Sequence, residues 1–188
     1  MKPVSLLFLF IIFTHSLKAQ ENEAARQFIR EVIKVKHVVY VDSAGDAGDE
    51  MRKILDRDTI HTLMQDDSTF VITKKERAHI NKELNTMRSF AWKAGLLDSS
   101  ILISEDTLKK VFSKKNGSPS ANWKYFHTHY GDGYYYFSKP IFLRNNTICI
   151  FRFGYWCDWT LCGHGHLAIY EKKGGKWVAW YPLKAWQL

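Results

Sequence analysis

The C-terminal part of the chain constrains the fold most, because its aromatic residues fall into strand-like segments joined by short turns. Residues 121–188 contain 6 of the 7 Trp, 8 of the 9 Tyr and 5 of the 12 Phe. Aromatic and β-branched residues favour strands. Four segments have this composition: YYYFSKPIF, TICIFRFGY, HLAIYEKK and KWVAWYP.

The connections between these segments predict how the strands pair. Asn145-Asn146 and Gly174-Gly175 can adopt the positive φ angles that tight hairpins require, and short connections make neighbouring strands antiparallel. We therefore expect an antiparallel meander of about four strands over residues 134–182. Trp177 should be buried where the last strand begins.

Residues 21–120 instead show apolar residues at helical spacing, as in Ala25, Phe28, Ile29, Val32 and Ile33. Thr73 and Glu76 form a capping-box pattern, which predicts a helix ending near Met87. The other expected elements are a short strand at HVVYV and helices around Met51, through Ile60, Leu63 and Met64, in SEDTLKKVFSKK and in NWKYFHTHY. The whole predicts one α+β domain over residues 21–188, with mostly helical residues 21–120 packed against one face of the meander.

The first twenty residues have the layout of a secretory signal peptide. Lys2 precedes an apolar run from Val4 to Phe13, and a polar segment ends in Ala19-Gln20. The run is about ten residues long, whereas a spanning helix needs about 20. We expect cleavage after Ala19 or Gln20 and no membrane span afterwards. The protein is then exported, to the periplasm, the cell surface or the medium.

The charge of the exported chain points away from nucleic acid. Removal of Lys2 and Lys18 lowers the net charge from +8 to +6, and the remaining charges are dispersed. A nucleic-acid binder usually has a basic stripe or a recognisable motif, and the sequence has neither. The expected partner is an unidentified ligand of the envelope or extracellular space.

The segment CDWTLCGHGH, residues 157–166, permits three interpretations. The first is a metal site, because Cys157-x4-Cys162, His164-x-His166 and His127-x-His129 have ligand-like spacing. However, His127 and His129 point to nearly opposite sides of the predicted helix. The second is a Cys/His active site, yet no known catalytic motif surrounds it. We therefore assign no catalytic residue, metal ligand or cofactor.

The third interpretation is a disulfide between Cys157 and Cys162, with Cys149 free. Oxidation is expected outside the cytosol, and cysteines opposite each other on antiparallel strands lie within disulfide range. Gly163 and Gly165 would relieve the crowded backbone beyond the bridge. The disulfide should hold the candidate binding residues in one arrangement: Trp156, Trp159, His164 and His166.

Three motifs resemble those of a group of uncharacterised exported proteins from Bacteroidota. The group has S-[KR]-P-x-F, C-G-x-L-C-G-x-G and K-x-x-G-K-W, and the matching segments here are SKPIF, CDWTLCGHG and KKGGKW. Asp158 replaces a glycine of the second motif, and the loop between the cysteines is slightly longer. The resemblance implies export and no particular activity.

These observations favour a non-catalytic binding or accessory domain of the cell envelope over an enzyme. The alternative is a hydrolase or metal-binding protein with its site in residues 157–166. A cluster in which the two histidines of GHGH converge with a carboxylate would favour that alternative.

Overall fold

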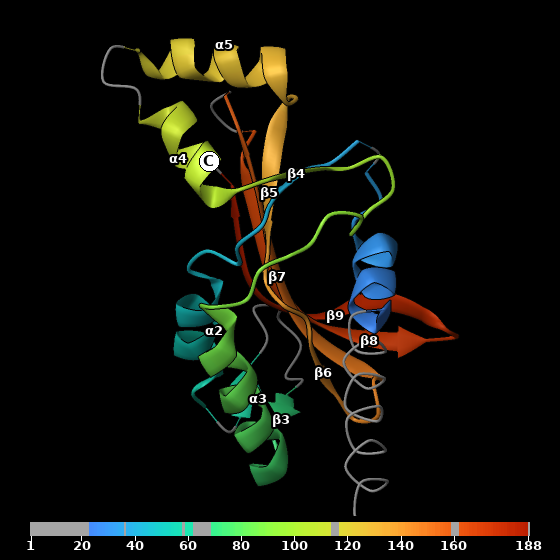
Figure 1. Cartoon of the computed structure of the whole chain (residues 1–188). Helices are drawn as coiled ribbons and strands as arrows, with labels where there is room; N and C mark the ends of the chain where they lie inside the picture. Colours follow the sequence, from blue (N-terminus) through green and yellow to red (C-terminus); the bar gives the residue numbers. More distant parts are fainter. Residues whose placement is uncertain are drawn as a thin grey trace, which may run out of the picture.

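The C-terminal strands form most of a mixed sheet in the computed structural model (Figure 1), which describes residues 23–35, 37–57, 59–61, 69–113, 117–158 and 162–187. β7 (Ile148–Cys157), β8 (His164–Lys173) and β9 (Lys176–Gln187) are successive antiparallel neighbours. β5 (Gly133–Phe137) and β6 (Ile141–Leu143) pair with the two halves of β7. The antiparallel meander is therefore confirmed, with its first predicted strand divided into two.

The predicted signal peptide lies outside the described residues.

The sheet extends beyond residues 134–182, which corrects the expected extent and purely antiparallel pairing. β1 (Val39–Val41) pairs in parallel with both β5 and β4 (Ile101–Ile103), so the described order is β4-β1-β5-β7-β8-β9. β2 (Thr59–His61) and β3 (Thr69–Val71) form a separate antiparallel pair. Ile60 thus lies in a strand where a helix was expected, while Leu63 and Met64 lie outside the described residues. β1 confirms the short strand predicted in HVVYV, whereas β2 was not predicted because three residues carry too little periodic pattern to distinguish a strand from a helix.

The described helices agree with the other helical predictions. A helix covers residues 23–32, and four more follow it: α2 (Ala47–Leu55), α3 (Lys74–Met87), α4 (Glu105–Phe112) and α5 (Pro119–His129). None of the described helices is long and apolar enough to span a membrane. The part before residue 120 is nevertheless mixed and not mostly helical, because it also contains β1 to β4.

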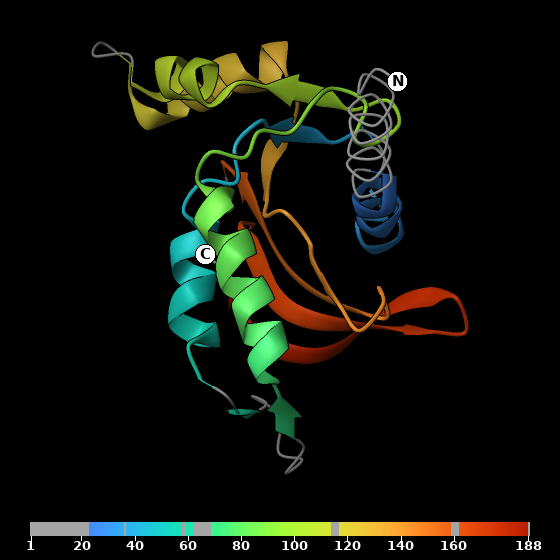
Figure 2. The same ribbon diagram turned by 60° about the horizontal axis from the view of Figure 1, so that its bottom comes forward.

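Helices cover both faces of the sheet, whereas the sequence suggested one. The helix of residues 23–32 lies on the inner side of the curved strands, and α2 and α3 lie on the outer side (Figure 2). α4 and α5 cover the same outer face near β1, through Leu108, Val111 and Phe126. The reason is that β7 is buried on both faces over its first five residues. Such a strand needs a hydrophobic layer on each side.

Phe28 is the main contact of the N-terminal helix with the inner face. Its side chain is fully buried, and its ring meets four others edge-on with centroids 5.1–5.9 Å apart: Phe142, Phe151, Tyr170 and Trp177. Trp177 itself is only partly buried, which corrects the prediction that it is buried. It lies on the edge strand β9, where no further strand covers it among the described residues.

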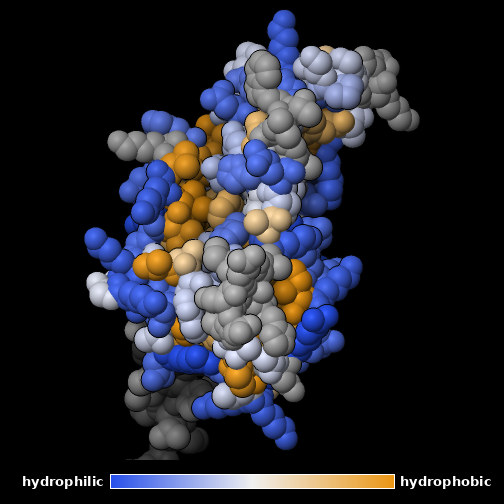
Figure 3. Space-filling view, turned by 180° about the vertical axis from the view of Figure 1, so that it is seen from behind, coloured by the Kyte–Doolittle hydropathy of each residue, from blue (hydrophilic) through white to orange (hydrophobic). Residues whose placement is uncertain are grey.

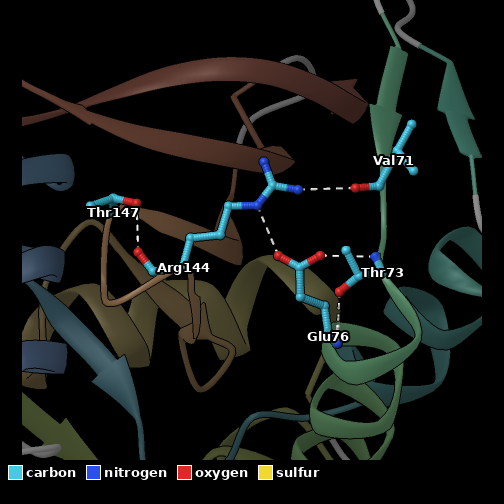
Figure 4. Close-up of polar contacts among 5 residues, drawn as sticks. All are labelled: Val71, Thr73, Glu76, Arg144 and Thr147. Atoms are coloured by element: carbon cyan, nitrogen blue, oxygen red, sulfur yellow. Dashed lines mark hydrogen bonds and ion pairs between the residues drawn. The ribbon is translucent and has the colours of Figure 1, made fainter.

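The predicted capping box begins α3 (Figure 4). The Thr73 hydroxyl accepts a hydrogen bond from the Glu76 amide (3.2 Å), and the Glu76 carboxylate accepts one from the Thr73 amide (2.9 Å). Arg144 in the β6–β7 turn donates to Glu76 (2.8 Å) and to the Val71 carbonyl (3.0 Å). Glu76 therefore joins a local helix start to a turn that is distant in sequence.

Arg152 is a charged residue buried on the outer face. Its side chain is 7% exposed and forms an ion pair with Glu50 of α2, which also pairs with Lys184 of β9. Asp46 lies 3.7 Å from the same guanidinium. Burial opposes ionisation of Glu50, but Lys184 and Arg152 together hold the pKa of its carboxyl below the usual value. This ion-pair cluster connects α2 to β7 and β9.

Candidate binding site beside the disulfide

Cys157 and Cys162 form the predicted disulfide, with Cα atoms 6.0 Å apart. The β7–β8 register pairs Tyr155 with His164. Its continuation by two residues places the cysteines opposite each other, because antiparallel strands run in opposite directions. Cys149 is free and fully buried, also as predicted. Burial raises the pKa of its thiol well above the usual value, so this thiol is not ionised at neutral pH.

The disulfide does not hold the candidate binding residues in one arrangement. Side chains alternate between the faces of a strand, and Trp156 consequently lies on the outer face while His164 and His166 lie on the inner face. Trp159 lies outside the described residues. The expected four-residue group is therefore divided by the sheet itself.

Phe153, Tyr155, His164 and His166 form a group of rings on the inner face, which we call the histidine face. Tyr155 and His164 have ring centroids 5.4 Å apart, and Phe153 lies 6.1 Å from each histidine. His164 is exposed, and the other three side chains are partly buried. The strand pairing of β7 and β8 places these rings side by side.

Two ionisable side chains of the histidine face are held in their neutral forms. Burial lowers the pKa of His166 below 6.5, which favours the neutral imidazole. Burial also raises the pKa of Tyr155, with a smaller contribution from the negative charge of Asp132, so its hydroxyl stays protonated. The His166 Nδ1 lies 3.4 Å from the Tyr170 hydroxyl. The surface can therefore offer ring faces and hydrogen-bonding groups to a ligand.

Trp156 has a packing role on the outer face. Its ring lies 5.0 Å from that of Trp186 and stacks parallel to Tyr134 at 6.2 Å. A Cβ at Gly154 would overlap the Trp156 ring, and a Cβ at Gly165 would overlap that of Trp186. Gly165, the second glycine of GHGH, is thus required because the Trp186 indole ring lies against the strand there. This corrects the expectation that Gly165 relieves a crowded backbone.

An interaction between His127 and Asp158 was not expected from the sequence. The His127 Nε2 of α5 lies 3.6 Å from the Asp158 carboxylate beside the disulfide, and its Nδ1 lies 3.1 Å from the Gly131 carbonyl. His129 instead stacks on Tyr125. The described residues contain no group of three or more potential metal ligands. The contact joins α5 to the disulfide-bonded turn, and no sequence pattern indicated it because the two residues are 31 positions apart in the chain.

The histidines of GHGH do not converge on a carboxylate in the described part of the chain. His164 Nδ1 lies 3.3 Å from the Cys162 carbonyl, and His166 approaches the Tyr170 hydroxyl. No family model, curated protein or solved structure matches the chain. The site is therefore interpreted from its own geometry and chemistry.

Proposed function

We propose that the protein is an exported binding domain of the cell envelope, without catalytic activity, and that the histidine face holds its ligand. The observation that carries this proposal is the grouping of four incompletely covered rings on two adjacent strands. A contiguous group of exposed or partly exposed rings often marks a binding site. The neighbouring disulfide favours a rigid surface, since it closes the turn between the two strands.

The chemistry of these side chains favours a carbohydrate chain as the ligand class. Ring faces with hydroxyl and imidazole groups at their edges combine apolar contact with orientation by hydrogen bonds. The neutral forms of His166 and Tyr155 suit a neutral sugar better than an acidic one. The predicted net charge of +6 on the exported chain would separately attract it to anionic envelope polymers.

Binding to the envelope can be tested with residues 21–188 on a glycan array and against solubilised envelope fractions, using thermal shift to detect ligands. For a sugar that binds, we expect Tyr155→Ala to weaken affinity by about tenfold or more, as for an aromatic hot-spot residue. His164→Ala should also weaken binding, and this exposed side chain can be removed with little effect on folding. Trp180→Ala is the matched control, because Trp180 is an exposed ring on another strand. Equal loss in all three variants, or none, would contradict the proposed site.

Export is a separate part of the proposal and needs its own test. The apolar run of residues 4–13 and the disulfide both support secretion. We expect N-terminal sequencing of the protein from its native host to find Gln20 or Glu21 as the first residue. Recovery of a chain that begins at Met1 in the membrane fraction would contradict this prediction.

A further inference from the structure

A second candidate site lies at the amino ends of β1 and β4, on residues outside the histidine face. Here the structure contains a cavity of about 450 Å³, which falls within the usual range for small-molecule sites. The C-terminal end of the helix of residues 23–32 forms one wall, and the loops that enter the two strands form the other.

The floor of the cavity is apolar. Ile33 and Leu97 are each 6% exposed and belong to the inner hydrophobic core, whereas Val35 at the rim is 53% exposed. A small apolar group that entered the cavity would meet a hydrophobic floor and cover Val35. Burial of such surface contributes roughly 25 cal/mol per Å².

The remaining walls carry a net positive charge. Arg30 and Lys34 supply two positive charges, while Asp98 is the only carboxylate among the described lining residues. The helix end adds about half a negative charge, which leaves the balance positive. Arg30 pairs with Asp98 at 3.1 Å, but their side chains remain 42% and 89% exposed, so the guanidinium is still accessible.

The two loops adopt an unusual backbone conformation at the cavity. His37 has φ 57° and Ser99 has φ 55°, and both residues line the cavity. Non-glycine residues in this left-handed region cost on the order of 1 kcal/mol each, and such strain is often found at functional sites. The β1–β4 pairing brings the two residues to the same end of the sheet.

We propose that this cavity binds a small organic anion with an apolar tail, its carboxylate or phosphate near Arg30 and Lys34 and its tail over Ile33, Leu97 and Val35. The apolar floor and the cationic wall each match one half of such a ligand. Octanoate is a suitable probe, with acetate and 1-octanol as probes that carry only the charge or only the tail.

The test is an NMR titration of the ¹⁵N-labelled exported chain with each probe. We expect saturable shifts at residues 30–35 and 97–101 with octanoate, and binding at least about tenfold weaker for acetate and 1-octanol. Added salt should weaken octanoate binding, because these charges are exposed. Equal affinity for 1-octanol, or no saturable binding of octanoate, would overturn the proposal.

Charge variants locate the site and exclude misfolding. Lys34→Gln and Arg30→Gln should each weaken octanoate binding by about threefold to tenfold. Asp98→Asn should strengthen it, and a gain in affinity is not produced by loss of structure. Arg88→Gln is the matched control, because Arg88 is also a surface arginine paired with an aspartate, Asp49, at 2.8 Å. Unchanged affinity in all three cavity variants would overturn the assignment, whatever the result at the histidine face.

Discussion

Replacing Arg152 by glutamine should lower the free energy of unfolding by about 3 kcal/mol at pH 7, because it leaves Glu50 largely buried without its buried ion-pair partner. The Glu50 side chain is 17% exposed and would keep only Lys184, which is 48% exposed. Urea denaturation followed by circular dichroism measures the change. Arg88→Gln breaks an exposed ion pair with the same change in charge, and should cost less than about 1 kcal/mol.

The pH dependence identifies the cause of this loss. The pKa of Glu50 is held below 4.5 in the folded state, so its contribution to stability is present above about pH 4.5 and is lost as pH falls through the lowered value. The difference between wild type and Arg152→Gln should therefore shrink towards acidic pH. Arg152→Met combined with Glu50→Leu should recover most of the stability, since an apolar pair of similar volume often replaces a buried ion pair without cost. If Arg152→Gln costs no more than Arg88→Gln, the cluster does not hold α2 against the sheet.

Phe28→Ala should lower the free energy of unfolding by about 4 kcal/mol, which is typical when a buried aromatic side chain leaves a cavity. The Phe28 ring is fully buried and contacts rings from β6, β7, β8 and β9 at once. Its loss should also release the N-terminal helix from the inner face. We expect faster amide hydrogen exchange over residues 23–32 and a larger exposure of Trp177.

Two variants serve as controls for Phe28. Phe28→Leu keeps an apolar side chain in the site and should cost about 1 to 2 kcal/mol. Val35→Ala removes a side chain that is 53% exposed, and should change stability by no more than about 0.5 kcal/mol. A Phe28→Ala protein as stable as Val35→Ala would mean that this helix does not stabilise the sheet.

Hydrophobic side chains also reach the surface away from the two proposed sites' charged and polar groups, as the space-filling view shows for one face (Figure 3). Seen from behind, hydrophobic side chains reach the surface in several patches, the largest of them in a hollow, with hydrophilic residues around it (Figure 3). The histidine face and the cavity beside β1 and β4 involve different residues and different chemistry. Results at one site therefore do not decide the other.

Several features of this protein depend on local interactions, and the sequence alone was sufficient to predict them. The capping box of Thr73 and Glu76 connects residues three apart. The Asn145-Asn146 and Gly174-Gly175 turns have the expected positive φ angles, although Arg144 joins the first of them with φ 52°. The disulfide followed from the placement of Cys157 and Cys162 opposite each other, at the ends of two antiparallel strands joined by a short loop. Each of these features is determined by neighbouring residues, so its pattern is visible in a short window.

The division of the candidate site between two faces could also have been predicted from the sequence, but only by working out which residues of the two strands pair. If Cys157 lies opposite Cys162, then Tyr155 lies opposite His164, and the alternation of side chains separates Trp156 from both histidines. The sequence prediction treated residues 157–166 as one loop and therefore placed Trp156 and both histidines together. The requirement for glycine at position 165 could not be predicted from the sequence, because the ring that excludes a Cβ there belongs to Trp186 on the next strand.

Only the tertiary structure decided the remaining features, because they join segments that are far apart in the chain. β1 and β4 are three-residue strands that pair in parallel across 59 intervening residues. No pattern within a short window of sequence could predict a pairing over that distance. Arg152 and Glu50 are 102 residues apart, and His127 meets Asp158 only when α5 packs beside the disulfide-bonded turn. Local sequence specifies helices, turns and strands through short-range sterics and hydrogen bonds. Which of their side chains meet is determined by the burial of both faces of the sheet.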